Sequence, residues 1–152
     1  MGLITGVRVV EIGAAMARCF AIAADIETAT QWQASLRDVD VLERDAARRA
    51  LVAETESDAK VKTVRARLRF SYEPDTEIRW VQERGDTKSL EGSWTFEDLG
   101  SGLTRASYAL AVDPGRMLGL LLRGPAEGKV RDFLLGGAAE GLKTRAEDDL
   151  TS

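Results

Sequence analysis

The chain has 152 residues, of which 44% are apolar and 30% charged, a balance that fits one globular domain and excludes a disordered chain. The formal net charge of -4 argues against a nucleic-acid partner, because nucleic-acid-binding domains usually carry a basic excess. The sequence shows no apolar run long enough to span a membrane and no signal peptide. We therefore expect one cytoplasmic domain over residues 1–152, without stable membrane insertion.

The residue inventory limits the chemistry further. The chain contains no histidine, which excludes Ser/His/Asp and Cys/His arrangements and argues against a catalytic zinc site. Cys19 is the only cysteine, and it falls in an apolar segment of small residues, so we expect a buried, reduced thiol. We expect no metal and no cofactor, and no catalytic residue is assigned.

The first elements are a strand and two helices. Residues 6–12 alternate and predict a strand, whereas residues 14–24 repeat at helical spacing, with Met16, Cys19, Phe20 and Ala23 on one side. Asp25 is the predicted N-cap of a short helix over residues 26–33, near the end of which lies Trp32.

A period of two then runs through the middle of the chain and predicts further strands around residues 36–44, 49–57, 61–72, 78–82, 90–97 and 106–112. Residues 100–102 (Gly-Ser-Gly) predict a tight hairpin turn. Each strand has one apolar and one polar face. A meander of this kind must cover its apolar face with another element.

The covering element is predicted at the end of the chain. Residues 126–147 form a long helical pattern whose apolar stripe comprises Val130, Phe133, Leu134, Ala138, Gly141 and Leu142. Residues 117–122 are a short apolar patch before it, which either plugs one end of the sheet, forms a lid, or touches lipid or a partner. The predicted fold class is α+β, an antiparallel sheet wrapped on a long C-terminal helix.

Most of the aromatic residues share the apolar face of the sheet: Phe70, Tyr72, Trp80, Trp94, Phe96 and Tyr108. They form either a filled core or the wall of a ligand pocket. Gln82 and Thr104 have the same inward parity, and a few polar groups among aromatic ones are typical of a small-molecule site. Glycines in the helix, Gly136, Gly137 and Gly141, indicate close packing on the sheet or room for a ligand.

Two patterns suggest phosphate or nucleic-acid binding but have a simpler explanation. Residues 124–129 (GPAEGK) lack the spacing of a phosphate-binding loop. The outward arginines Arg65, Arg67 and Arg69 are expected to form cross-strand ion pairs with outward glutamates: Glu77, Glu83, Glu91 and Glu97. The sequence does not specify whether Glu54 and Glu56 point to the inner or the outer face of the sheet.

The order of elements and several strings resemble the START-like helix-grip superfamily (SRPBCC), and within it the polyketide cyclase/dehydrase and lipid-transport group. The resemblance extends from about Val7 to about Glu147. It rests on residues 20–25 (FAIAAD) followed by Trp32, 39–45 (VDVLERD), 67–72 (RLRFSY), 78–80 (IRW), 90–94 (LEGSW), 102–105 (GLTR) and the long last helix ending in Leu142 and Lys143.

The resemblance implies a seven-stranded antiparallel sheet gripping the last helix, with a cavity that binds a lipid, polyketide or quinone-like molecule. The expected lining is Trp32, Phe70, Tyr72, Trp80, Gln82, Trp94, Tyr108, Phe133, Leu134 and Gly137. Gln82, Thr104 or a tyrosine hydroxyl would orient the ligand. We favour a non-catalytic binder. The alternatives are a polyketide cyclase or dehydrase, with Tyr72 or Tyr108 as proton donor, and an accessory protein acting through residues 117–122. The sequence leaves open whether the protein forms a homodimer.

Overall fold

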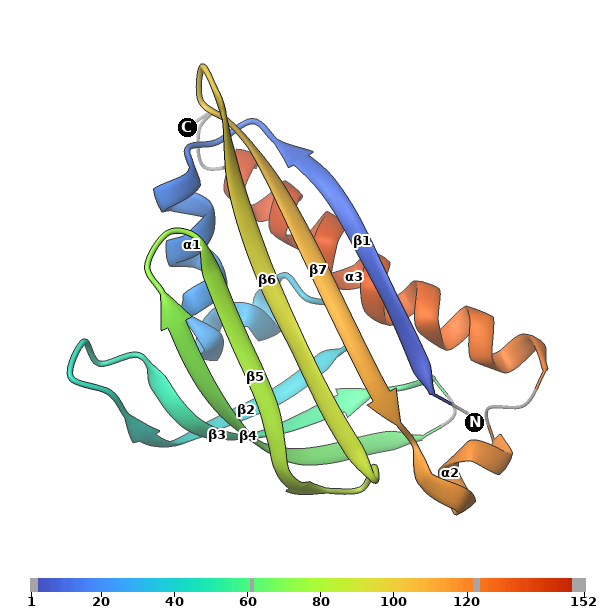
Figure 1. Cartoon of the computed structure of the whole chain (residues 1–152). Coiled ribbons are helices and arrows are strands. Elements are labelled where there is room, and N and C mark those ends of the chain that lie inside the picture. The colour runs from blue at the N-terminus through green and yellow to red at the C-terminus, as the bar shows by residue number, and fades with distance from the viewer. Residues whose placement is uncertain (1–2, 61, 122–123, 149–152) are drawn as a thin grey trace.

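A computed structural model describes residues 3–60, 62–121 and 124–148 of the chain (Figure 1). The elements in chain order are β1 (Ile4–Ile12), α1 (Met16–Ala24), the 3-10 helix η1 (Ile26–Gln31), β2 (Leu36–Arg44), β3 (Ala50–Asp58), β4 (Thr63–Glu73), β5 (Glu77–Gly85), β6 (Ser89–Gly100), β7 (Leu103–Asp113), α2 (Gly115–Leu121) and α3 (Pro125–Asp148).

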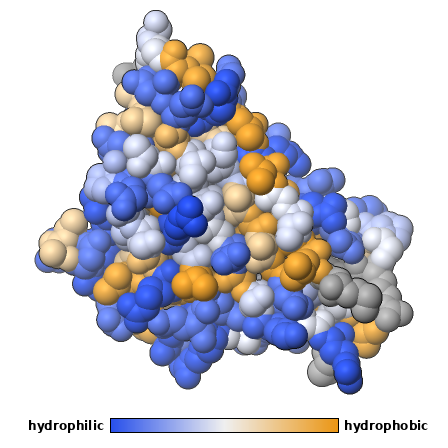
Figure 2. All heavy atoms as spheres, in the orientation of Figure 1, coloured by the Kyte–Doolittle hydropathy of each residue, from blue (hydrophilic) through white to orange (hydrophobic). Residues whose placement is uncertain are grey.

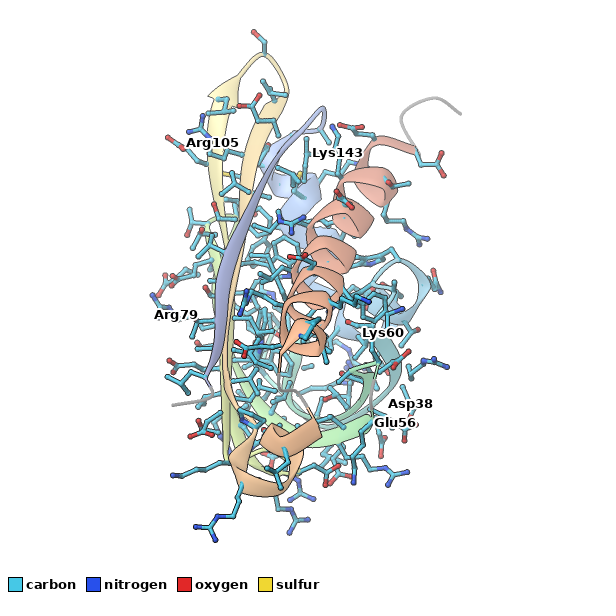
Figure 3. All side chains as sticks on the ribbon, turned by 90° about the vertical axis from the view of Figure 1, so that its right-hand side faces the viewer. Asp38, Glu56, Lys60, Arg79, Arg105 and Lys143 are labelled. Atoms are coloured by element: carbon cyan, nitrogen blue, oxygen red, sulfur yellow. The ribbon has the colours of Figure 1, made fainter. Side chains whose placement is uncertain are left out.

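The strands form one seven-stranded sheet in the order β1-β7-β6-β5-β4-β3-β2, and every neighbouring pair is antiparallel. The strands curve around α3, which packs against β1, β7 and α1 (Figures 1 and 3). The predicted α+β helix-grip class is confirmed. The first strand pairs with the last, Ile4 opposite Val112, so the helix lies over the part of the sheet where the two meet.

The alternation in β4 shows why these residues form this sheet. Val64, Ala66, Leu68 and Phe70 are buried on the inner face, while the arginines between them point outward. Arg69 pairs with Glu83 at 2.7 Å, as expected. The other two arginines also form cross-strand ion pairs, but the predicted partners are wrong, because they pair with glutamates of β3: Arg65 with Glu56 and Arg67 with Glu54. Both of those glutamates therefore face outward.

The predicted N-cap at Asp25 and the helix after it need correction. Asp25 makes no side-chain hydrogen bond to the turn that follows it, and that turn is a 3-10 helix ending at Gln31. Residues 117–122, read as an apolar patch, lie mostly within α2, where Leu118 is buried and Leu120 is 55% exposed. Leu122 lies outside the described residues, as does Val61, with which we expected β4 to begin.

The buried face of α3 is rotated from the predicted stripe. Its buried residues include Leu135, Ala139 and Ala146, which the stripe omitted, while Phe133 is only partly buried. The helix packs closely on the sheet, because a Cβ on Gly6 of β1 would meet the side chain of Leu135 at 2.5 Å.

Close packing explains why position 141 of α3 is a glycine. A Cβ at this position would collide with the backbone carbonyl of Trp32, so the missing side chain allows α3 to lie directly on the segment after η1. Gly137 has only an ordinary contact, 3.6 Å to Ala34, and Gly128 has open space around it. Of these three glycines, close packing therefore requires only Gly141.

We predict opposite effects for two glycine substitutions in α3. Gly141→Ala should destabilise the protein by roughly 1–3 kcal/mol, because the clash is with backbone that cannot rotate away. Gly128→Ala meets no neighbour and should stabilise it by up to about 1 kcal/mol through helix propensity. Denaturant unfolding of both variants is the measurement. Equal effects of the same sign would contradict the packing role of Gly141.

Candidate functional site

A cavity of about 130 Å³ lies between the inner face of the sheet and the helices. The buried side chains of the interior form two groups. The larger group surrounds Phe20, Trp94 and Leu142, and the smaller one contains Ile4, Leu118 and Val130. Residues of both groups line the cavity, so the inner face of the sheet is not one continuous filled core.

Aromatic rings form one wall of the cavity. Phe70, Trp80, Trp94 and Tyr108 come from β4, β5, β6 and β7, and Trp32 adds a ring from the segment after η1. The ring centroids of Trp94 and Tyr108 are 4.8 Å apart, and those of Trp32 and Trp94 are 6.3 Å apart. Rings at these separations pack against one another, which holds the wall in one arrangement.

Aliphatic side chains form the wall toward α2. They come from β1, β7, α2 and α3 and comprise Ile4, Leu110, Val112, Leu118, Val130 and Leu134. None of these side chains carries a polar atom. Affinity at this wall would therefore come from removing apolar surface from water, at about 25 cal/mol per Å².

A few polar side chains line the cavity: Gln33, Ser35, Thr55, Ser57, Thr87 and Tyr108. The side chain of Gln33 lies close to the hydroxyl of Tyr108, and both residues line the cavity. Burial raises the pKa of Tyr108 well above its usual range, and the Gln33 contact offsets this only in part. The hydroxyl therefore keeps its proton at neutral pH and can donate a hydrogen bond. The indole Nε1 of Trp32 is buried and has no hydrogen-bond partner within the described ranges.

Six of the ten expected lining residues lie in the cavity wall: Trp32, Phe70, Trp80, Trp94, Tyr108 and Leu134. The other four do not. Gln82 is bonded to Thr87 twice, through its amide nitrogen at 2.9 Å and its oxygen at 3.0 Å, and this closes the β5–β6 turn. Phe133 lies under the ammonium group of Lys60 at 4.0 Å, and Gly137 lies against Ala34.

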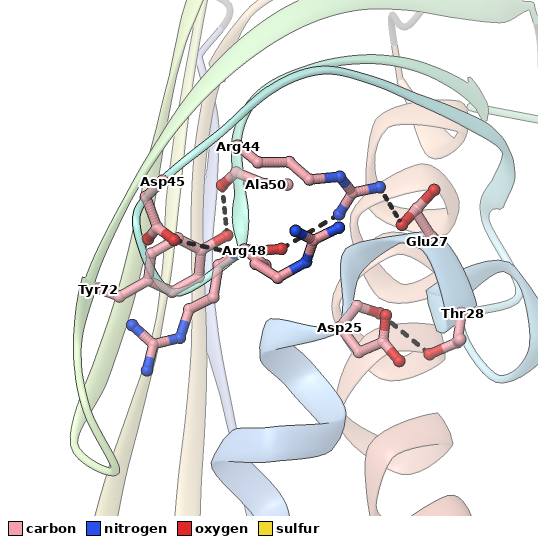
Figure 4. Close-up of polar contacts among 9 residues, drawn as sticks. Asp25, Glu27, Thr28, Arg44, Asp45, Arg48, Ala50 and Tyr72 are labelled. Atoms are coloured by element: carbon pink, nitrogen blue, oxygen red, sulfur yellow. Dashed lines mark hydrogen bonds and ion pairs between the residues drawn. The ribbon is translucent and has the colours of Figure 1, made fainter.

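Tyr72 is the fourth residue outside the cavity wall, and its position also corrects its assignment as a proton donor. Its hydroxyl donates to the carbonyl of Ala50 at 2.6 Å, at the far end of β4 beside the β2–β3 turn (Figure 4). Arg49 covers the ring at 5.4 Å. Thr104 is likewise structural, because its hydroxyl donates to the carbonyl of Ala14 at 2.7 Å in the core.

Sequence reasoning missed most of the aliphatic wall because it selected mainly aromatic residues. The inward alternation of β4 and β7 already places Val64, Leu68, Leu110 and Val112 on the same face as the aromatic residues. Gln33 follows η1 and had no periodic signal. Among the described residues, no group of acidic or cysteine side chains is arranged to hold a metal ion.

Gly92 determines the position of one wall residue. It lies directly opposite Trp80 in the β5–β6 ladder, and a Cβ there would be about 2.5 Å from the indole ring. The ring of Trp80 therefore occupies the space that a side chain at position 92 would need. From there it reaches Tyr108, at a centroid distance of 5.7 Å.

The fold and this cavity together define a START-like helix-grip protein, as the resemblance implied. The family model described as polyketide cyclase / dehydrase and lipid transport matches residues 12–135. The chain belongs to that family. No curated protein matches its sequence. Of the helices in the described ranges, none has both the length and the apolar character needed to cross a membrane.

Solved structures share the fold over almost their whole length. A START superfamily protein from Mycobacterium smegmatis is 20% identical with a TM-score of 0.81, covering 95% of this chain and 97% of its own. A protein from Thermus thermophilus is 23% identical, with a TM-score of 0.81 and 99% coverage of both chains. The Zhui aromatase/cyclase from a Streptomyces species is 15% identical, with a TM-score of 0.75, covering 97% of this chain and 96% of its own.

We predict that Gly92→Ala changes the cavity without changing the fold. The added methyl group should displace the indole of Trp80 and destabilise the protein by roughly 1–3 kcal/mol. The near-ultraviolet circular dichroism of the tryptophans should change while the far-ultraviolet spectrum stays the same. Ser93→Ala, the next residue on the same strand, is the control. A Gly92→Ala variant with an unaltered tryptophan spectrum would rule out the contact.

Proposed function

We propose that this chain binds an apolar small molecule, of the lipid, polyketide or quinone-like kind, in the cavity between sheet and α3. The observation that carries the proposal is the composition of the wall: aromatic and aliphatic side chains on most sides, and a few polar side chains, among them Tyr108 and Gln33. Apolar sites with a few placed polar groups are typical of small-molecule binding.

The size of the cavity favours a compact ligand. At about 10–15 Å³ for each water-sized sphere, its volume corresponds to roughly ten such spheres. That suits a ring compound or a short acyl segment better than a whole phospholipid. The ligand's apolar part would lie against Trp80, Trp94 and Leu118, and an oxygen atom would accept a hydrogen bond from Tyr108. Native mass spectrometry of the protein purified from its own host would identify the ligand.

All three tryptophans of the chain line the cavity, so their fluorescence should report on binding directly. We predict that menadione, a small apolar quinone, quenches this fluorescence with a saturable dependence on concentration. Trp94→Ala should weaken its binding at least about tenfold, because the loss of a large apolar contact removes well over 1 kcal/mol.

Tyr72→Phe provides a matched control, because it removes an aromatic hydroxyl outside the cavity. It should leave menadione binding unchanged, whereas Tyr108→Phe should weaken it by roughly three- to tenfold through loss of one hydrogen bond. If Trp94→Ala binds menadione as tightly as the unmodified protein, the cavity is not the site.

A second candidate function is cyclisation or dehydration of a polyketide, and the position of Tyr108 is the observation that favours it. Its protonated hydroxyl is the only side-chain acid among the cavity-lining residues in the described part of the chain. In this case Tyr108→Phe should abolish turnover of a poly-β-ketone analogue while retaining its binding. Turnover unaffected by Tyr108→Phe would eliminate this candidate.

A further inference from the structure

Lysine is unevenly distributed in this chain. Four of its five lysines, Lys60, Lys62, Lys88 and Lys129, lie in turns or at the start of α3. The β3–β4 turn, the β5–β6 turn, the end of β7, α2 and the start of α3 all lie toward one end of the antiparallel sheet, along the bottom and lower right of Figure 1. The structure thus brings these four lysines together with Arg116 of α2. We call this surface the lysine end.

Several acidic groups at this end have hydrogen-bond partners. Asp58 is bonded to Arg37 at 2.9 Å, Asp86 accepts from the backbone of Arg65, and Glu127 is bonded to Arg131 at 2.8 Å. Within the described ranges, the side chains of Lys62, Arg116 and Lys129 form no ion pair. In a chain of net negative charge, these three cations at the lysine end therefore carry positive charge that no acidic side chain neutralises by direct pairing.

Exposed apolar side chains lie at the same end. Leu120 of α2 is 55% exposed, and Leu3, before β1, is 52% exposed. Leu118 of α2 is buried and forms part of the cavity wall. One face of this short helix therefore lines the cavity while Leu120 points to solvent. Figure 3 shows nitrogen-tipped side chains projecting around α2, with Lys60 beside α3.

We propose that the lysine end docks on an anionic lipid surface. Unpaired cations around exposed leucines match the two components of such a surface, negative headgroups and the apolar region beneath them. An acidic protein would satisfy the lysines but would not require leucines exposed beside them. Because Leu118 is in the cavity wall, docking would bring the cavity next to the lipid. The proposal concerns the surface only and holds whatever the cavity binds.

The test is co-sedimentation of the unliganded protein with vesicles of two compositions. We expect binding to vesicles containing phosphatidylglycerol, little binding to pure phosphatidylcholine, and loss of binding as salt rises. The double variant Lys62→Glu/Lys129→Glu should weaken binding at least about tenfold, since each cation near an anionic bilayer contributes about 1 kcal/mol. Leu120→Gln should weaken binding to the same vesicles by about threefold or more through loss of apolar burial.

The matched control is Arg48→Glu/Arg79→Glu, which changes the net charge equally but away from the lysine end. Arg48 lies in the β2–β3 turn at the opposite end, and Arg79 lies on the outer face of the sheet (Figure 3). This control should bind vesicles as the unmodified protein does. Equal loss in both double variants, or equal binding to both lipid compositions, would overturn the proposal. Menadione quenching should persist in every variant, which separates this test from that of the cavity.

Discussion

The structure depends on one constraint: among the described residues, only α3 is a long helix that can cover the curved apolar face of the sheet. Where α3 meets the sheet and the segment after η1, the fit is close enough to need glycine. Gly6 accommodates Leu135, and Gly141 accommodates the carbonyl of Trp32. The helices do not fill the whole concave face: the buried side chains form two groups, and residues of both line the cavity. The site is thus a consequence of how the sheet is covered.

The outer face of the sheet, unlike the apolar inner face, carries mainly charged side chains. Arginine and glutamate side chains form pairs across β3–β4, β4–β5 and β6–β7, such as Arg67 with Glu54 and Arg105 with Glu97. These pairs are exposed, so each contributes little to stability. They keep the outer face of the central strands hydrated. β1 differs, because Val7 and Val9 are 61% and 50% exposed and no described helix covers that face. Figure 2 shows the outer face as a mainly hydrophilic surface with separate apolar areas.

The sequence predicted the strands and the helix-grip fold well, since period-two alternation specifies which side chains face inward. It predicted the cavity less well, because parity does not specify position along a strand. Tyr72 shares its face with Phe70 and Trp80, yet it lies beyond the cavity, where the strand reaches the β2–β3 turn. Gln82 also has inward parity, but it lies at the opposite end of the sheet and bonds Thr87. Gly92 positions Trp80 because it has no side chain, and no pattern in the sequence identifies such a position.

The pairing of β1 with β7 has a consequence for how the cavity forms. Ile4 and Val112 lie opposite each other although nearly the whole sheet separates them along the chain, and both line the cavity. Contacts between residues so distant in sequence are slow to form, because closing a long loop costs conformational entropy before any contact compensates for it. During synthesis, β1 emerges first and has no partner until β7 and α3 have followed. The cavity is therefore among the last features to exist, and a partly folded chain cannot hold a ligand there.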